Sequence, residues 1–357
     1  MKLALRRFVH SIPGFLTKAG AVLALVFLPA AQEAQADAPE AVILVYHRFG
    51  EDDVPSTSIR LAQLEAQLDW LVSAGASFPS LDTVVAAFET GRPLADFSVV
   101  FTVDDAYRSA AGEAWPRLKA RGIPMTLFVA TDAIDDGAQR MLDWDALRAL
   151  AADGVTLGFH GAAHGHMAFM DEAAVKADFA RGLKRMTKEL GRAPALFAYP
   201  YGEYSLILRE MVKRAGFRAA FAQVSGVASA AQDRYALPRF AINEAYGALA
   251  RFRLIARARA LPVAAVMPAD PLITGANPPD FRFRLGAGAP APTRITCYPS
   301  HRAGAASLQP LRNGWLAVDL ATPLPLGRSR INCTAPGAQG RWYWFGWPFL
   351  LPGGPLD

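Results

Sequence analysis

The chain has 357 residues, of which 52% are hydrophobic and 19% are charged, and it holds two cysteines. A composition this apolar excludes an intrinsically disordered protein, and two cysteines exclude a disulfide-dense scaffold or a four-cysteine zinc finger. The 37 basic against 32 acidic residues give a formal net charge of +5, which taken alone suggests an anionic partner.

Residues 1–36 have the pattern of a secretory signal peptide. A start with four basic residues precedes an apolar run at 19–31, and Ala34-Gln35-Ala36 fits a signal-peptidase site before Asp37. The run is too short to cross a bilayer of roughly 30 Å comfortably, so an uncleaved membrane anchor is the less favoured alternative. Cleavage leaves 33 basic and 31 acidic residues, so most of the positive charge belongs to the leader. We therefore predict a secreted or periplasmic protein with no stable membrane span after cleavage and no nucleic-acid partner.

Residues 37–261 alternate short apolar runs with amphipathic stretches. Apolar residues recur at helical spacing between the runs, for example at Val175, Phe179 and Leu183. Repeated β–α units predict a parallel sheet covered by helices, and six or more of them favour a barrel or distorted barrel over a short open sheet. The predicted strands are Val42–Tyr46, Ser98–Val103, Met125–Ala130, Val155–Phe159, Ala195–Tyr199 and Arg218–Ala222.

The composition changes near residue 262. Residues 262–357 hold eight Arg, no Lys and four acidic residues, and 262–279 is rich in Pro, Ala and Gly, which is typical of a linker or irregular crossing. We predict a small all-β module over 262–357, in which Cys297 and Cys333 can form a disulfide if the protein is exported. The aromatic residues at 342–349 either fill the module's core and fasten it to the barrel, or present a glycan-binding surface. The predicted strands are Phe281–Leu285, Arg294–Tyr298, Trp315–Val318 and Arg341–Phe345.

Polar residues directly follow four of the predicted barrel strands. Because the carboxyl ends of parallel strands share one rim, these residues are expected to converge there. Taken singly, each pattern has an ordinary structural explanation as a helix cap, a surface histidine pair or a turn. The residues are His47, Asp104 with Asp105, His160 with His164, and Tyr199–Gly202.

One carboxylate and two imidazoles form a ligand set with open positions for a divalent ion. Asp105, His160 and His164 supply that set, with Zn²⁺ as the predicted ion and Co²⁺, Ni²⁺ or Fe²⁺ as alternatives. Such an ion polarises a carbonyl and lowers the pKa of a water molecule. Asp104, next to the ligand Asp105, is then free to act as the general base.

Two further groups complete a hydrolytic site. His47 can protonate a leaving group, and the backbone N–H of Tyr201, in a tight Pro-Tyr-Gly turn, can donate to a developing oxyanion. These roles predict the hydrolysis of an acyl bond assisted by a metal ion.

Three motifs in residues 40–250 resemble those of the polysaccharide deacetylase family, carbohydrate esterase family four. They are Thr102-Val103-Asp104-Asp105, His160-Gly161-Ala162-Ala163-His164 and Pro200-Tyr201-Gly202. The resemblance implies a distorted (β/α)₇-type barrel, with the small all-β module following it. It also implies the roles given above for Asp104, the three metal ligands and Tyr201.

The chain departs from the family pattern in several places. Gly161 replaces the usual Ser or Thr and removes a hydroxyl that would brace the histidine loop. Ala198-Tyr199 stands where many members have an Arg before the turn, and Arg239 is a candidate to orient Asp104 instead. We also place Tyr199, Pro200 and Arg239 among the substrate-binding residues.

The acid histidine comes from an unusual place in the chain. No Leu-x-His motif follows at the end of the barrel region, whereas Leu44-Val45-Tyr46-His47 lies on the first strand. This resembles the circularly permuted subgroup that includes deacetylases of biofilm poly-N-acetylglucosamine, and it implies that His47 is the acid.

We therefore predict a hydrolase that removes N-acetyl groups from N-acetylhexosamine residues of a polysaccharide. The polysaccharide resembles poly-N-acetylglucosamine or chitin, or is peptidoglycan. One alternative is an O-acetyl esterase on acetylated glycans, because the same site serves both bonds. Another is a catalytically degraded glycan-binding protein in exopolysaccharide export. A non-haem iron oxygenase ranks last, because its usual His-x-Asp order is absent.

Overall fold

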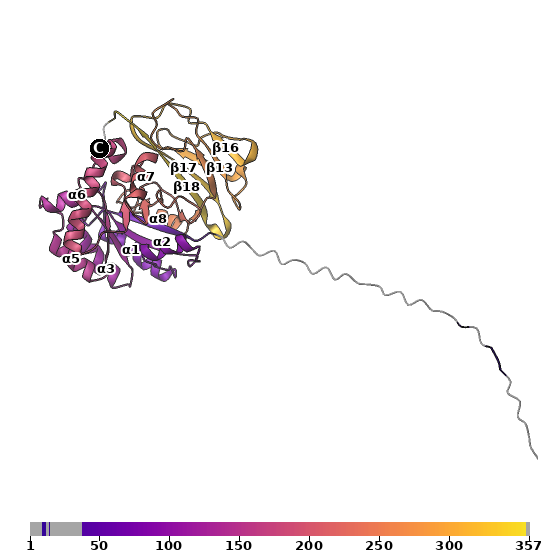
Figure 1. Cartoon of the computed structure of the whole chain (residues 1–357), viewed down its shortest axis with the longest axis horizontal. Helices are drawn as coiled ribbons and strands as arrows, with labels where there is room; N and C mark the ends of the chain where they lie inside the picture. The colour runs from indigo at the N-terminus through magenta and orange to yellow at the C-terminus, as the bar shows by residue number, and fades with distance from the viewer. Residues whose placement is uncertain (1–8, 12–13, 15–37, 355–357) are drawn as a thin grey trace, which may run out of the picture. The chain divides into compact units, whose positions relative to one another are not determined.

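The computed structural model describes residues 9–11, 14 and 38–354 (Figure 1). The predicted signal peptide, residues 1–36, lies outside the described residues apart from 9–11 and 14. From residue 38 onward the described chain forms one compact unit. Among the described residues, no helix combines the length and the apolar character needed to cross a membrane.

A curled parallel sheet forms the centre of the N-terminal part of this unit. Within residues 38–354 its strands run in the order β10, β1, β4, β5, β6, β7, β8, and the short β9 pairs antiparallel with the start of β1. All six barrel strands predicted from the sequence are present. The bounds are β1 Glu40–Tyr46, β4 Val99–Val103, β5 Met125–Val129, β6 Thr156–Phe159, β7 Leu196–Ala198, β8 Ala219–Phe221, β9 Ala228–Ser229 and β10 Phe240–Ala241, with a small separate pair β2 Arg48–Phe49 and β3 Ser58–Ile59.

The two edges of the sheet meet at the segment 237–241. Leu237 forms a parallel bridge with Phe221 of β8, and Phe240 of β10 pairs with Leu44 of β1. The sheet thereby curls into a distorted barrel, as predicted. Strands β4 and β5 are buried along their whole length, which explains why they are continuous apolar runs rather than alternating ones.

Helices cover the outside of the sheet (Figure 1). The predicted stripe on α6 is partly buried: Val175 and Phe179 face the core, where Phe179 meets Phe159 and Phe197 edge-on. Asp171 caps the start of α6 by accepting from the Ala174 N–H. The bounds are α1 Leu61–Ser73, α2 Leu81–Thr90, α3 Trp115–Lys119 after a π-helical turn, α4 Thr131–Asp135, α5 Trp144–Ala152, α6 Glu172–Leu190, α7 Leu206–Arg214 and α8 Leu249–Ala256.

The later part of the chain, orange and yellow in Figure 1, is rich in antiparallel strands. Within residues 38–354 it contains one sheet in the order β11, β18, β17, β14 and a second in the order β12, β13, β16, β15. A disulfide between Cys297 and Cys333 joins β14 to β17, where the two residues are directly paired. The bounds are β11 Arg259–Ala260, β12 Val263–Met267, β13 Arg282–Leu285, β14 Thr296–Pro299, β15 Leu308–Pro310, β16 Trp315–Val318, β17 Gly327–Pro336 and β18 Trp342–Leu351.

The prediction of a linker or irregular crossing at 262–279 is wrong for the first part of that segment. Val263–Met267 is strand β12, and it pairs antiparallel with β13. The sequence did not reveal this strand because its surroundings are rich in Pro and Ala. The strand is also only partly buried and lacks a clear alternation of apolar and polar residues.

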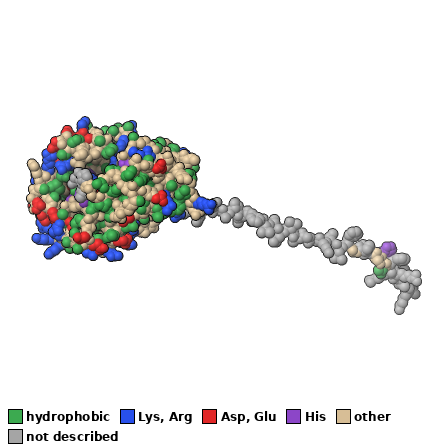
Figure 2. All heavy atoms as spheres, turned by 90° about the horizontal axis from the view of Figure 1, so that it is seen from above, with side chains coloured by type: hydrophobic (Ala, Val, Ile, Leu, Met, Phe, Trp, Pro, Cys, Tyr) green, Lys and Arg blue, Asp and Glu red, His purple; other side chains and the backbone are tan. Residues whose placement is uncertain are grey.

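Strand β18 packs the β-rich part against the barrel. Phe345 and Phe349 are buried in the core of the β-rich part, whereas the ring of Trp344 meets Phe240 of β10 edge-on at 5.2 Å. Arg341, just before the strand, donates two hydrogen bonds of 2.8 Å to the carboxylate of Asp96. These contacts account for three of the six aromatic residues at 342–349 by packing, whereas Trp342 is exposed. The face of the molecule in Figure 2 mixes basic, acidic and hydrophobic side chains, with no charge dominating it.

Candidate active site

The rim at the carboxyl ends of the strands brings the three predicted metal ligands together. Asp105 follows β4, His160 follows β6, and His164 lies in the loop after it. The Oδ1 atom of Asp105 is 3.3 Å from Nε2 of His160 and 3.2 Å from Nε2 of His164. One ligand atom from each residue lies within 4.8 Å of the other two, which is compact enough for a single ion to contact all three.

The chemistry of these donors fits a divalent cation. Asp105 Oδ1 is buried and has no hydrogen-bond partner among the described residues. His160 donates from Nδ1 to the carbonyl oxygen of Ala198 at 2.8 Å, so the lone pair on its Nε2 faces Asp105. A carboxylate oxygen and two neutral imidazole nitrogens are a common set for zinc and related ions.

The backbone around the rim is held in uncommon conformations. Asp105, Ala106, His164 and Tyr201 all have φ between 53° and 75°, in the left-handed region that non-glycine residues rarely adopt. Each such residue costs on the order of 1 kcal/mol or more, so the surrounding contacts must hold it in place.

Asp178 on α6 braces the histidine loop. Its carboxylate accepts hydrogen bonds from the backbone N–H of Ala162 at 2.7 Å and of Ala163 at 2.9 Å. Gly161 has φ of 78°, and a Cβ there would lie 2.6 Å from Cε of Met167. The loop therefore favours glycine, and the bracing that a hydroxyl would give comes from Asp178 instead. The sequence offered one sign of this residue, a carboxylate on the buried stripe of α6.

A buried ion pair holds the proposed base. Asp104 is 1% exposed and Arg239 is fully buried. The guanidinium donates two hydrogen bonds, from Nη1 to Oδ1 at 2.8 Å and from Nη2 to Oδ2 at 2.7 Å, and its Nε donates to the carbonyl of Ala222 at 3.0 Å. Burial alone would raise the pKa of Asp104, but the surrounding positive charge, that of Arg239 foremost, outweighs it and lowers that pKa. Asp104 is therefore ionised at neutral pH, as a general base requires.

The predicted substrate-binding residues lie in the interior. Tyr199 is fully buried and donates from its hydroxyl to the carbonyl of Tyr235 at 2.8 Å. Pro200 is also buried, and Arg239 is occupied by Asp104. This burial argues against direct contact of the three side chains with a polymer, and favours supporting roles behind the rim.

His47 lies after β1 and next to Gln223, which the sequence patterns did not single out. The Nε2 atoms of the two side chains are 3.1 Å apart. Burial lowers the pKa of His47, and the negative charges of Asp105 and Asp104 oppose that effect only partly. Gln223 also contacts the Pro-Tyr-Gly turn, because a Cβ on Gly202 would lie 2.2 Å from the Gln223 backbone nitrogen.

The ring of Tyr201 lies among the histidines of the rim. It stacks on His166 with centroids 3.8 Å apart and planes 4° apart, and it meets His164 edge-on at 4.6 Å. His166 in turn contacts the Oε2 atom of Glu203 through Nδ1 at 2.8 Å. The turn that carries Tyr201 is thus packed directly against the metal-ligand loop.

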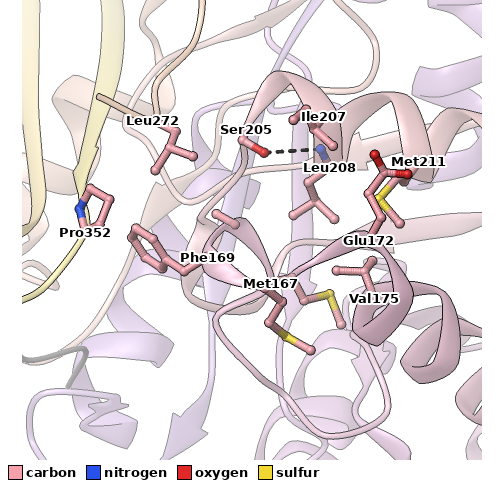
Figure 3. Close-up of a pocket in the computed structure, with 12 residues that line it drawn as sticks. Met167, Phe169, Glu172, Val175, Ser205, Ile207, Leu208, Met211, Leu272 and Pro352 are labelled. Atoms are coloured by element: carbon pink, nitrogen blue, oxygen red, sulfur yellow. Dashed lines mark hydrogen bonds between the residues drawn. The ribbon is translucent and has the colours of Figure 1, made fainter. Parts of the chain in front are cut away.

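An apolar pocket of about 260 Å³ is lined in part by the turn that follows the histidine loop (Figure 3). Its lining comes from the turn Met167–Phe169, the first residues of α6 and α7, Leu272 and Pro352. None of the predicted catalytic or ligand residues lines it, so this pocket is distinct from the metal-ligand cluster.

Residues 91–220 match the family model described as polysaccharide deacetylase. The match includes Asp104, Asp105, both histidines of the cluster and Tyr201. Residues 91–220 therefore form part of a polysaccharide deacetylase domain.

Similar proteins extend the comparison beyond the matched range. The chain is 24% identical over 212 residues to a poly-β-1,6-N-acetyl-D-glucosamine N-deacetylase of Staphylococcus aureus, which covers 56% of this chain and 73% of that protein. It is 22% identical over 201 residues to a putative polysaccharide deacetylase of Bacillus subtilis, which covers 56% of this chain and 71% of that protein.

Two solved structures share the fold. A deacetylase of Streptococcus pyogenes in complex with acetate superposes with a TM-score of 0.55 at 20% identity, covering 60% of this chain and 99% of that one. A de-N-acetylase of Aggregatibacter actinomycetemcomitans gives a TM-score of 0.54 at 18% identity, with the same coverage.

Proposed function

We propose that this protein is a metal-dependent N-deacetylase of a polysaccharide of the poly-β-1,6-N-acetyl-D-glucosamine type. The observation that carries the proposal is the cluster of Asp105, His160 and His164 beside the buried pair of Asp104 and Arg239. The polymer class is supported by the Staphylococcus aureus relative, whose name states that substrate.

Each residue of the rim has a defined part in the hydrolysis. A divalent ion held by the cluster would polarise the acetyl carbonyl and lower the pKa of a nearby water. Asp104 accepts the proton of the attacking water, and the Tyr201 N–H donates to the oxygen that becomes negative. His47, in its protonated form, gives a proton to the departing nitrogen as the carbon–nitrogen bond breaks, and the negative charges of Asp105 and Asp104 favour that form. The products are acetate and a free amino sugar.

Two supporting residues prepare these groups. Arg239 holds both oxygens of Asp104 and keeps the carboxylate ionised and oriented toward the cluster. Gln223 contacts His47 and restricts its imidazole. Neither acts on substrate directly, and their function is to fix the base and the acid in position.

An oxidising compartment outside the cytoplasm suits this activity. The disulfide between Cys297 and Cys333 is of the kind that persists in exported proteins. The signal-peptide pattern at residues 1–36 points the same way, and a secreted or periplasmic enzyme would meet its polymer there.

Acetate release from matched glycans tests the substrate assignment. We expect acetate from β-1,6-linked N-acetylglucosamine oligomers, and little from O-acetylated xylan oligomers. Asp104→Asn should lower kcat by about 10²- to 10⁴-fold, because it removes the general base. The exposed Asp145→Asn is the matched control and should retain full activity.

Two results would contradict the proposal. Preferential release from the O-acetylated oligomers would identify an O-acetyl esterase. Undiminished activity of Asp104→Asn would remove Asp104 from the mechanism.

A further inference from the structure

Strand β17 of the C-terminal module, residues 262–357, brings an arginine to the Pro-Tyr-Gly turn of the barrel. Arg328 donates from Nη1 to the carbonyl oxygen of Tyr201 at 3.5 Å. Its guanidinium carbon lies 5.2 Å from the centroid of the Tyr201 ring, which is within cation–π range. Its Nε is 3.5 Å from Oε1 of Glu203. One side chain therefore contacts the backbone, the ring and the following acid of the same turn.

The turn needs such contacts to keep its shape. Tyr201 has φ of 57°, which a non-glycine residue adopts only when its surroundings impose it. The carbonyl and the ring of Tyr201 leave the same Cα as its N–H. Holding both of them opposes rotation about the N–Cα bond, which is the rotation that would change φ and turn the N–H relative to the ring and the carbonyl.

Arg328 is well placed to supply this constraint from outside the barrel. Its side chain is 43% exposed, so it lies at the edge of the site rather than in a core. Glu203, which it faces, is 2% exposed and also contacts His166, whose ring stacks on Tyr201. Arg328, Glu203 and His166 thus enclose Tyr201 with contacts from two parts of the chain.

We propose that Arg328 is a positioning residue for the oxyanion-binding N–H of Tyr201, so that the C-terminal module completes the active site of the barrel. The inference rests on the proposed function, because it assigns Arg328 to the same hydrolytic step. Loss of Arg328 weakens stabilisation of the transition state while leaving the metal ligands, Asp104 and His47 intact.

The test compares Arg328→Ala and Arg328→Lys with Arg330→Ala in the full chain. Arg330 lies two residues along β17 and is also exposed, and among the described residues its side chain makes no hydrogen bond, ion pair or cation–π contact with the turn. Kinetic constants are measured on whichever acetylated glycan the wild-type protein hydrolyses, together with zinc content and Tm. A wild type that prefers another acetylated glycan contradicts the proposed substrate but leaves this comparison intact.

We expect Arg328→Ala to lower kcat by roughly 10-fold with KM, zinc content and Tm near wild type, because an oxyanion donor is misplaced rather than removed. Arg328→Lys should recover part of the loss, and Arg330→Ala should match wild type. Wild-type kcat for Arg328→Ala, or an increase in KM with kcat unchanged, would overturn the inference. An equal loss in Arg330→Ala would also overturn it, since the effect would then belong to the strand and not to this contact.

Discussion

The ion pair between Asp104 and Arg239 affects both the stability of the fold and the chemistry of the site. Both side chains are almost completely removed from water, and each provides the other's main charge compensation. The net contribution of such a pair to folding stability is small, because desolvation offsets much of the attraction. Removing one partner is a different matter, because it leaves a buried charge without compensation.

Arg239→Met is therefore expected to destabilise the protein by about 3–5 kcal/mol and to abolish most of the activity. Chemical denaturation and acetate release measure the two effects. Arg234→Met is the control: Arg234 is 36% exposed, is 3.7 Å from Glu89, and should contribute less than about 1 kcal/mol. Equal stability of the two variants would contradict the account of the buried pair.

The same pair predicts a dependence of stability on pH. The pKa of Asp104 is lower in the folded protein than in the unfolded chain, so its contribution is complete above the unfolded pKa of about 4. It is lost as the pH falls through the lower folded pKa. The difference in unfolding free energy between wild type and Asp104→Asn should therefore shrink below about pH 4. Denaturation curves at a series of pH values check this, and a constant difference would contradict it.

Asp178 connects helix α6 to the loop that carries His160 and His164. In Asp178→Asn, one amide oxygen can still accept from one backbone N–H, but the side-chain NH₂ then faces the other N–H. We expect zinc affinity to fall by roughly 10- to 100-fold, as for other losses of outer-shell support. Zinc titration of the chelator-treated protein measures this. The control Arg181→Ala removes an exposed partner of Asp178 at 3.4 Å and should bind zinc like wild type.

At the scale of elements, the barrel strands were predictable because each is a short buried apolar run. Strand β17 was not predicted, because its sequence from Gly327 to Pro336 shows no obvious alternation. Its buried positions hold Gly327, Ser329, Ile331, Cys333 and Ala335, so small and polar residues conceal the period of two. Only pairing with β14 and β18 reveals which face is inside.

The disulfide stabilises this weakly patterned strand. The bond closes a segment whose ends are 36 residues apart, which corresponds to about 4 kcal/mol of chain entropy in the unfolded state. Replacing both Cys297 and Cys333 by Ala should lower the unfolding free energy by about 2–5 kcal/mol. Denaturation of the variant and of the wild type, each with and without reductant, measures this. An unchanged unfolding free energy of the wild type after complete reduction of the disulfide would contradict the prediction.

At the scale of the whole molecule, sequence motifs located some residues of the site and missed others. The spacing of polar residues after strands located His47, Asp104, Asp105 and the histidine pair, because parallel strands align their ends. Asp178, Gln223 and Arg328 carry no motif. They reach the site from a helix, a loop and strand β17, so only the folded chain brings them together.

The central claim is that the cluster of Asp105, His160 and His164 holds a metal ion needed for deacetylation. The most direct measurement is acetate release from β-1,6-linked N-acetylglucosamine oligomers, before and after chelation and on stepwise return of zinc, for wild type and Asp105→Ala. The account predicts that wild-type activity disappears with the chelator and returns with about one zinc per chain, whereas Asp105→Ala stays inactive throughout. Full activity of the metal-free protein, or of Asp105→Ala, would contradict it.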